Sequence, residues 1–218
     1  MNLNKLKKSA AFAVLKYISL ISVIGIGTGS TIKHLIKLLP NLKLKGVISS
    51  SSSSSFLLKK YKISELYLND VLYLFLYIDG ADEINMSLYM IKGGGAALTK
   101  EKIIATKAIK FICIIDEFKM VDTLGSFPLP VEIIPMAYKF VKFELQKLGY
   151  LTKLRKNFIT ENGNIILDIY NLSIKKPNLI EKKINSIPGV VTVGLFTYRK
   201  ADLVFIGTMY GIKIIKDI

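Results

Sequence analysis

Cysteine, histidine and tryptophan are almost missing from this 218-residue chain, and each absence narrows the chemistry open to it. Cys113 is the single cysteine, His34 is the single histidine, and there is no tryptophan. One cysteine cannot form a disulfide within the chain, and one histidine cannot supply a multi-histidine metal site. The scarcity excludes a small disulfide-stabilised scaffold, and it makes zinc chemistry and a Ser-His-Asp triad poor candidates.

Arginine is also scarce, although the chain carries 31 basic residues against 16 acidic ones and a net charge of +15. Only Arg155 and Arg199 are arginines, whereas base readout and bidentate phosphate binding favour arginine. The lysines are spread along the chain, and a lysine-rich, arginine-poor composition is what A+T-biased codons produce. A basic surface for a polyanion is the alternative. We expect no nucleic-acid partner and a charge that suits a small anionic ligand.

Long hydrophobic runs are absent as well, since none reaches the roughly 18 residues of a membrane span. Lys5, Lys7 and Lys8 precede an apolar stretch as in a secretion signal, but Lys16 interrupts it and no cleavage site follows. Apolar residues at three- and four-residue steps over residues 3–17 predict an amphipathic helix instead. We expect a cytoplasmic protein with no membrane partner.

Short apolar runs alternate with helical patterns over the first 125 residues. Strands are expected at 21–26, 46–48, 71–78 and 111–115, and helices at 31–39, 56–61 and 99–109. This alternation indicates an α/β fold with a Rossmann-like, mostly parallel sheet. Seven consecutive serines at 49–55 are expected to form a polar loop.

A second domain is indicated after residue 125, where Pro128 and Pro130 forbid a helix. The expected elements follow the order of a small α+β, ferredoxin-like domain. They are strands at 131–134, 151–155, 165–170 and 190–196, and helices from Pro135 to about residue 148 and at 178–185. Residues 202–206 and 212–215 are apolar enough to rejoin the first sheet. We expect a catalytic domain at 1–125 plus 200–218, and a smaller domain at 126–199 that serves as a lid or in oligomerisation.

A glycine-rich turn at residues 25–31 lies where the first strand is expected to pass into a helix. Backbone N–H groups at such a position bind phosphate. The turn has Gly25 and Gly27 but lacks the third glycine and the acidic residue of a dinucleotide fingerprint, and it lacks the Gly-Lys-Ser/Thr of a P-loop. Ser30 and Thr31 favour a compact monophosphate, and a tight turn that simply requires glycine is the alternative.

Asp79, Asp82 and Glu83 follow the strand expected at 71–78, so they emerge at the carboxyl end of a parallel strand, where open α/β sheets bind ligands. Three carboxylates within five residues favour a function over a solvated acidic turn. Magnesium binding through Asp79 and Asp82 is the alternative, because hard cations prefer oxygen ligands.

Residues 92–101 (KGGGAALTKE) combine a lysine, three glycines and a glutamate. The glycines let the backbone approach a ligand, and Thr99 is expected to cap a helix with Glu101 in its first turn. Glu101 is a candidate general base, although a carboxylate at a helix start is commonly a surface residue. Lys92 can stabilise an enediolate oxygen without a metal. Lys119 follows the strand expected at 111–115, so it is expected at the same edge of the sheet as these candidates.

These loops each follow an expected strand at its carboxyl end, so we expect them to converge. They predict a cofactor-free proton-transfer enzyme that acts on a small phosphorylated substrate. A sugar-phosphate sensor and an acyl-CoA transferase on similar folds are the rival classes. The sensor has no need of Glu101 beside Lys92, and the transferase needs a CoA-sized cleft.

Six strings resemble those of ribose-5-phosphate isomerase, type A, in order and over essentially the whole chain: 25–31, 79–85, 91–104, 127–137, 161–168 and 187–196. The resemblance implies isomerisation between ribose 5-phosphate and ribulose 5-phosphate in the non-oxidative pentose phosphate pathway, through an enediolate and without a metal or cofactor. It also implies a homodimer or a dimer of dimers.

The resemblance assigns roles to the candidate residues. Glu101 matches the general base that moves a proton between C2 and C1, and Asp79, Asp82 and Lys92 match the groups that handle ring opening and the sugar oxygens. Lys119 resembles a basic contact at the phosphate end. The expected substrate-binding residues are Thr28, Gly29, Ser30, Thr31, Asp79, Gly80, Ala81, Asp82, Lys92, Gly93, Gly94, Gly95 and Lys119.

Two departures from the family's usual pattern fall outside these candidates. The serine run replaces a mixture of small, polar and charged residues, and Phe118 stands where a small residue is common. Both concern the loops and the fit at the phosphate end, where Lys7 is a further candidate contact.

Overall fold

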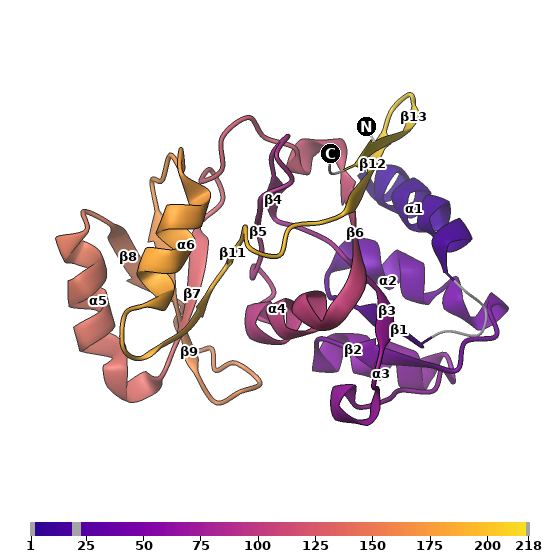
Figure 1. The fold of residues 1–218 in the computed structure, drawn as a ribbon, viewed down its shortest axis with the longest axis horizontal. Helices are drawn as coiled ribbons and strands as arrows, with labels where there is room; N and C mark the ends of the chain where they lie inside the picture. Colours follow the sequence, from indigo (N-terminus) through magenta and orange to yellow (C-terminus); the bar gives the residue numbers. More distant parts are fainter. Residues whose placement is uncertain (1–2, 19–22, 217–218) are drawn as a thin grey trace. The chain divides into compact units, whose positions relative to one another are not determined.

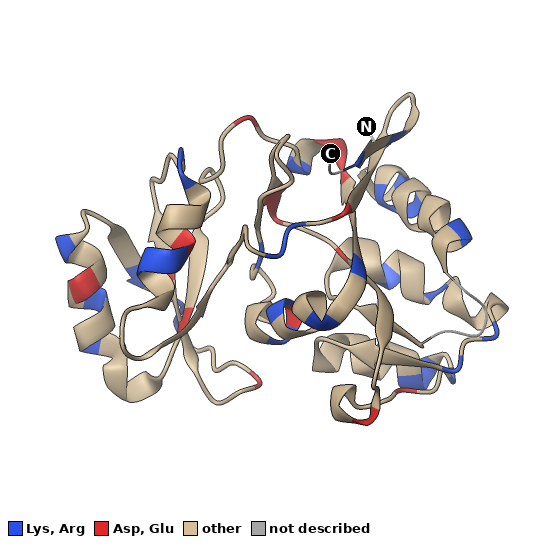
Figure 2. Cartoon of the chain, viewed as in Figure 1, with Lys and Arg blue, Asp and Glu red and all other residues tan. Residues whose placement is uncertain are grey.

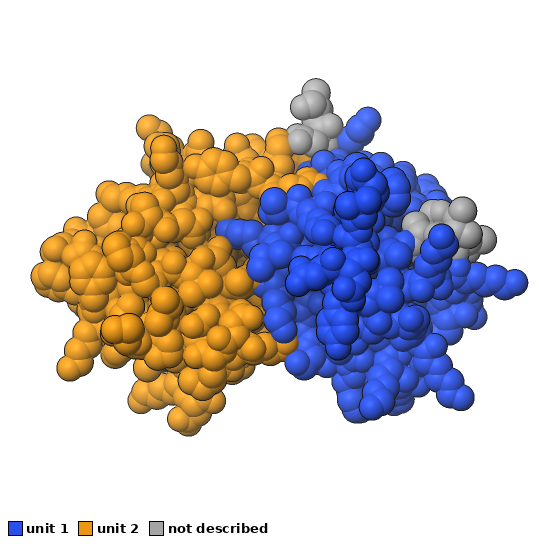
Figure 3. Space-filling view, turned by 60° about the horizontal axis from the view of Figure 1, so that its bottom comes forward, with its two compact units in different colours: residues 1–81, 100–119, 201–218 blue, residues 82–99, 120–200 orange. Residues whose placement is uncertain are grey.

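The structure is a computed structural model that describes residues 3–18 and 23–216, and it forms two compact units (Figure 3). The first unit contains Met1–Ala81, Lys100–Lys119 and Ala201–Ile218, and the second contains Asp82–Thr99 and Met120–Lys200. The domains expected from the sequence, 1–125 plus 200–218 and 126–199, differ from these units mainly at residues 82–99. The division into a catalytic domain and a smaller domain stays a prediction.

A six-stranded sheet lies at the centre of the first unit, in the order β13-β12-β6-β3-β1-β2 (Figure 1). Its neighbouring strands from β2 to β12 are parallel, and β13 pairs antiparallel with β12. The strands are β1 (Val23–Ile26), β2 (Gly46–Ser49), β3 (Leu74–Asp79), β6 (Ala108–Asp116), β12 (Leu203–Thr208) and β13 (Gly211–Lys216). This order confirms the predicted mostly parallel sheet and the return of the last strands to it. Ile21 and Ser22, the predicted start of the first strand, lie outside the described residues.

The first unit also contains helices, and those that precede β3 share a buried core with this sheet. The helices are α1 (Leu3–Ala13), followed by a 3-10 turn at Val14–Tyr17, α2 (Ser30–Ile36), α3 (Ser52–Lys60) and α4 (Leu98–Lys107), which begins in the second unit. Most side chains of β3 and β6 are buried, as in parallel sheets covered on both faces. Among the described residues, no helix combines the length and apolar character needed to cross a membrane.

The second unit contains a four-stranded antiparallel sheet in the order β10-β7-β9-β8. Its elements are β7 (Leu129–Ile133), α5 (Tyr138–Lys147), β8 (Leu151–Leu154), β9 (Ile165–Tyr170), α6 (Pro177–Asn185) and β10 (Val190–Val193). The fourth strand lies beside the first, and the third lies between the first and the second, which is the predicted ferredoxin-like arrangement. One buried cluster joins this sheet to both helices.

A three-stranded sheet that the sequence did not predict completes the second unit. Its strands β11 (Leu195–Phe196), β5 (Met90–Ile91) and β4 (Glu83–Ile84) have two residues each. Asp82 directly precedes β4, and Lys92 directly follows β5. The small sheet therefore fixes the main chain beside two of the candidate residues.

The polar loop predicted at residues 49–55 is wrong for its second half. α3 begins at Ser52, inside the serine run, and the Ser51 side chain caps it by accepting a hydrogen bond from the N–H of Ser54 at 3.2 Å. Serine is among the favoured N-cap residues, so a run of serines supplies a cap at the helix start. The hydroxyl of Ser54 donates to the carbonyl oxygen of Gly27 at 2.7 Å. The serine run thus supports the glycine-rich turn.

Candidate active site

Asp79 ends β3 and is fully buried in the first unit. Its Oδ1 accepts hydrogen bonds from the N–H groups of Thr28 at 3.1 Å and Gly80 at 2.7 Å. Its Oδ2 accepts one from the Tyr77 hydroxyl at 2.6 Å. A buried carboxylate is costly unless donors satisfy it, so these three bonds explain how Asp79 is tolerated here and fix its orientation.

The glycine-rich turn fits closely around this carboxylate. A Cβ on Gly27 would overlap the side chain of Asp79, so only glycine can stand there. At Gly29 there is open space where a Cβ would lie, but its φ of +104° is a conformation that L side chains rarely adopt. The turn therefore requires Gly27 for space and Gly29 for its backbone.

Tyr77 and Glu101 share the surroundings of Asp79. Glu101 lies in the first turn of α4, as predicted, and its side chain is buried. Burial raises the pKa of Tyr77 well above its ordinary value of 10.0, and the negative charges of Asp79 and Glu101 raise it further. Tyr77 was not predicted from the sequence. The sequence feature that indicates its role is the two-residue spacing from Asp79, because this spacing places both side chains on the same face of a strand.

A cavity in the first unit brings the two predicted basic contacts together. It has a volume of about 400 Å³ and is lined by Leu3, Lys7, Asp116, Phe118 and Lys119. The Lys7 Nζ donates a hydrogen bond to the Ser30 hydroxyl at 2.9 Å. The cavity is therefore lined by two lysines and one aspartate, and one of the lysines is bonded to the glycine-rich turn.

Lys92 and the triple-glycine loop (residues 93–95) lie in the second unit, directly after β5. Lys92 is buried, its N–H donates to the Gly194 carbonyl oxygen at 2.8 Å, and its Nζ lies 5.5 Å from the centre of the Phe196 ring. The Oδ2 of Asp82 accepts a hydrogen bond from the N–H of Gly94 at 2.7 Å. Asp82 is thereby joined to the loop that follows Lys92.

Glu83, the third carboxylate of the predicted acidic cluster, supports the fold. It is buried and accepts hydrogen bonds from the N–H groups of Gly125, at 2.7 Å, and Phe127. It therefore holds the turn that precedes β7. Among residues 3–18 and 23–216, no group of three or more His, Cys, Asp or Glu side chains could hold a metal ion.

Thr99 does not cap α4, and that prediction is wrong, because the helix begins one residue earlier. Its hydroxyl donates instead to the buried carboxylate of Glu132 on β7. Three further donors bind the same carboxylate: Thr160 Oγ1 at 2.8 Å, Asn162 Nδ2 at 3.0 Å and Asn164 Nδ2 at 2.9 Å. Glu132 was missed, although an acidic residue inside an apolar strand pattern was a signal. It anchors the first turn of the helix that carries Glu101.

The candidate residues divide between the two units. The first contains residues 28–31 and 79–81 with Glu101 and Lys119, and the second contains Asp82 and residues 92–95. Along the chain, the two groups meet at the peptide bond between Ala81 and Asp82.

Comparison with known proteins decides the family. A family model described as ribose 5-phosphate isomerase A (phosphoriboisomerase A) matches residues 46–211, which is more than half of the chain. The chain belongs to the ribose-5-phosphate isomerase A family. This confirms the resemblance read from the six sequence strings.

Curated members of the ribose-5-phosphate isomerase A family match this chain from end to end. The protein of Buchnera aphidicola subsp. Schizaphis graminum is 58% identical over 219 residues, covering 100% of both chains. That of Blochmanniella pennsylvanica is 54% identical over 215 residues, covering 98% of this chain and 99% of its own.

Solved structures of ribose-5-phosphate isomerases share the fold. The enzyme from Neisseria gonorrhoeae is 43% identical, with a TM-score of 0.97 over 100% of this chain and 98% of its own. A D-ribose-5-phosphate isomerase in complex with phospho-erythronic acid is 38% identical, with a TM-score of 0.95 over 99% and 100%. These matches confirm the α/β fold class.

Proposed function

We propose that this chain catalyses the reversible isomerisation of D-ribose 5-phosphate to D-ribulose 5-phosphate, a reaction of the non-oxidative pentose phosphate pathway. The observation that carries the proposal is the 58% identity to a ribose-5-phosphate isomerase A over the full length of both chains. The buried carboxylates and lysine described above are the groups that an aldose–ketose isomerase needs for proton transfer.

Glu101 is the general base of this reaction. Its carboxylate removes the proton from C2 of the open-chain aldose and returns a proton to C1, so one group serves both steps. Its burial in the first turn of α4 limits exchange of that proton with water. A positioned general base contributes roughly 10²- to 10⁴-fold to the rate.

Lys92 and the two aspartates act on the sugar oxygens. The ammonium group of Lys92 stabilises the negative charge that develops on O1 of the enediolate. Asp79 and Asp82 handle ring opening and bind the hydroxyl groups. Asp79 is already oriented by three hydrogen-bond donors, and Asp82 by the N–H of Gly94, so little reorganisation accompanies the reaction.

The phosphate group binds in the cavity lined by Lys7 and Lys119, next to the Ser30 hydroxyl. The positive charges of these two lysines, which line the cavity together with Asp116, attract a phosphate monoester. We assign Thr28, Gly29 and Thr31 to the substrate-binding loop that carries Ser30.

The family resemblance also supports a homodimer in the cytoplasm. Light scattering coupled to size-exclusion chromatography measures the assembly state, and cell fractionation measures the location. A monomeric mass at working concentration would contradict the dimer.

The decisive experiment is the Glu101→Gln variant, assayed for ribulose 5-phosphate formed from ribose 5-phosphate. We expect kcat to fall at least about 10²-fold, because the amide cannot accept the C2 proton. Binding of phospho-erythronate, measured by calorimetry, is expected to stay within about threefold of wild type, because an amide retains the shape of the carboxylate.

The matched control is Glu144→Gln, which changes a glutamate on α5 in the second unit that pairs with Lys147. It is expected to keep wild-type activity. Near wild-type turnover by Glu101→Gln would contradict the role of the base. Binding of ribose 5-phosphate without any turnover in the wild-type protein would favour a sugar-phosphate sensor, and acyl transfer from a CoA ester would favour a transferase.

A further inference from the structure

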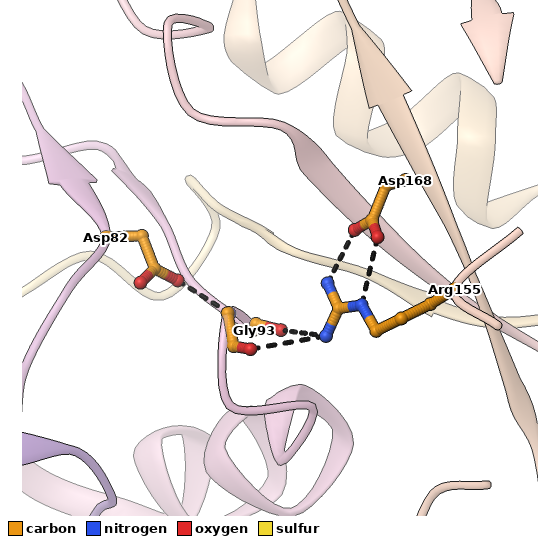
Figure 4. Close-up of polar contacts among 5 residues, drawn as sticks. Asp82, Gly93, Arg155 and Asp168 are labelled. Carbon is orange, nitrogen blue, oxygen red and sulfur yellow. Dashed lines mark hydrogen bonds and ion pairs between the residues drawn. The ribbon is translucent and has the colours of Figure 1, made fainter. Parts of the chain in front are cut away.

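Arg155 follows β8, and its side chain makes four hydrogen bonds within the second unit (Figure 4). Its Nε and Nη2 donate to the two carboxylate oxygens of Asp168 on β9, at 2.9 and 2.5 Å. Its Nη1 donates to the carbonyl oxygens of Gly93 and Gly94, at 3.2 Å each. The bidentate pair with Asp168 sets the plane of the guanidinium group and aims Nη1 at the triple-glycine loop.

The peptide group between Gly93 and Gly94 is held at both of its edges. Its carbonyl oxygen accepts a hydrogen bond from Arg155, and its N–H donates to Asp82. The C=O and N–H of a trans peptide point in opposite directions, so the two partners hold one plane from opposite sides. Rotation of this plane would break both hydrogen bonds together.

The triple-glycine loop has little stiffness of its own. Gly93 has φ of +105°, and Gly94 and Gly95 are exposed. A side chain could not stiffen the loop at Gly94, because a Cβ there would lie 2.7 Å from the Asp82 carboxylate and 3.0 Å from the Phe127 ring. Glycine is the most freely rotating residue, so the orientation of this peptide depends on the groups that bind it.

A lysine could not make the contacts of Arg155. The guanidinium group is planar and presents five donors in a fixed fork, whereas an ammonium group is a compact charge with three rotating donors. Only two of the 31 basic residues in this chain are arginines. One of them stands where two carboxylate oxygens and two carbonyl oxygens must be bound at once.

We propose that Arg155 is a positioning residue of the isomerase, which holds the Gly93–Gly94 peptide in the orientation that donates a hydrogen bond to Asp82. Asp168 acts through Arg155 by fixing the orientation of its guanidinium group. The proposal rests on the proposed function, since Asp82 and the neighbouring Lys92 act on the substrate there. Without the fork, the peptide rotates, Asp82 loses its donor, and the main chain beside Lys92 loses its fixed position.

The first test compares Arg155→Lys with Lys156→Ala, a matched control that changes the exposed cation next in the chain. We expect Arg155→Lys to lower kcat about 10-fold, while KM for ribose 5-phosphate changes less than about twofold, because misplacement affects the reaction more than binding. Lys156→Ala is expected to behave as wild type. We also expect about 10 mM guanidinium, but not ammonium, to restore part of the activity of Arg155→Ala, because only a planar fork fits the site.

The second test measures hydrogen exchange in the substrate-free protein and needs no turnover. We expect the Gly94 amide to exchange at least about 10-fold faster in Arg155→Lys, with unchanged protection in β7 and β9, because only the local peptide is released. Asp168→Asn is a second variant, expected to give the same change to a smaller extent.

Wild-type kcat in Arg155→Lys, wild-type exchange at Gly94, or an equal loss of kcat in Lys156→Ala would each overturn the proposal. A wild-type protein without isomerase activity would instead overturn the proposed function. In that case the exchange measurement still decides whether Arg155 holds the peptide.

Discussion

The carboxylate of Asp79 determines which residues can surround it. Gly27 must lack a side chain because a Cβ there would overlap this carboxylate, and Tyr77 supplies its hydroxyl from the same face of β3. Removing a donor from a buried carboxylate costs more than the bond's own contribution, because the charge is left unsatisfied. We therefore expect this part of the site to tolerate few substitutions.

Tyr77→Phe tests that hydrogen bond through its dependence on pH. The pKa of Tyr77 is raised above 10.0 in the folded protein, chiefly by burial, so the folded phenol stays protonated where the unfolded one ionises. Its contribution to stability is complete below about pH 10 and is lost as the pH rises further. We expect wild type to exceed Tyr77→Phe by about 1–3 kcal/mol in free energy of unfolding at neutral pH, and this difference to shrink above pH ~10.

Urea denaturation of the two proteins across that pH range measures the difference. The control is Tyr210→Phe, which removes a hydroxyl from a side chain that is 94% exposed. A gap between wild type and Tyr77→Phe that stays constant through pH ~11 would contradict the protonated state assigned to Tyr77.

The candidate site residues could be predicted where they stand in a short, distinctive stretch of sequence. Asp79, Asp82, Lys92 and Glu101 stand in strings of acids or glycines after expected strands, and the sequence therefore marked them as candidates. Arg155 was not predictable as a positioning residue, because its glycine partners are 62 and 61 residues away in the chain. Contacts at such separations depend on strand order, which periodicity does not give.

The cap at the N-terminus of α3 can be tested by substitution. Ser51→Ala removes the oxygen that accepts the N–H of Ser54. We expect it to lower the free energy of unfolding by about 0.5–2 kcal/mol. Ser53→Ala is the matched control, since Ser53 is exposed inside the helix, and it is expected to be neutral or slightly stabilising because alanine has the higher helix propensity. Equal effects of the two substitutions in thermal or urea unfolding would argue against the cap.

Some elements were predicted closely, whereas others were displaced at their ends or were not predicted. The strand at 165–170 and the helix starting near residue 178 were predicted to within a residue. β4 and β5 have two residues each, too few to show a period. The single strand expected at 190–196 is wrong, because these residues form β10 in one sheet and β11 in another. The helix expected at 99–109 ends at Lys107, because β6 begins at Ala108 with no glycine or proline to mark the change.

The net charge of +15 lowers the stability of the folded molecule through electrostatic repulsion. Lysine and arginine residues occur on helices and loops throughout the chain (Figure 2), so the repulsion is spread over the molecule. Salt screens such repulsion over a Debye length of about 10 Å at 0.1 M. We expect the melting temperature to rise by a few degrees between about 20 and 300 mM sodium chloride, measured by circular dichroism at pH ~7. A melting temperature that falls with salt would show that attractive ion pairs outweigh the repulsion.

The position of β12 has a consequence for biosynthesis. β12 lies between β6 and β13, and Phe111 of β6 binds Asp202, which is 91 residues later in the chain. The edge of β6 that pairs with β12 therefore stays unpaired while the ribosome makes the intervening segment. The sheet β10-β7-β9-β8 can form in that interval, because all its strands lie within residues 129–193. An apolar strand with a free edge is a template for aggregation. The nascent chain is most exposed to misassembly and to chaperone binding during this interval, after β6 has emerged and before β12 has followed it.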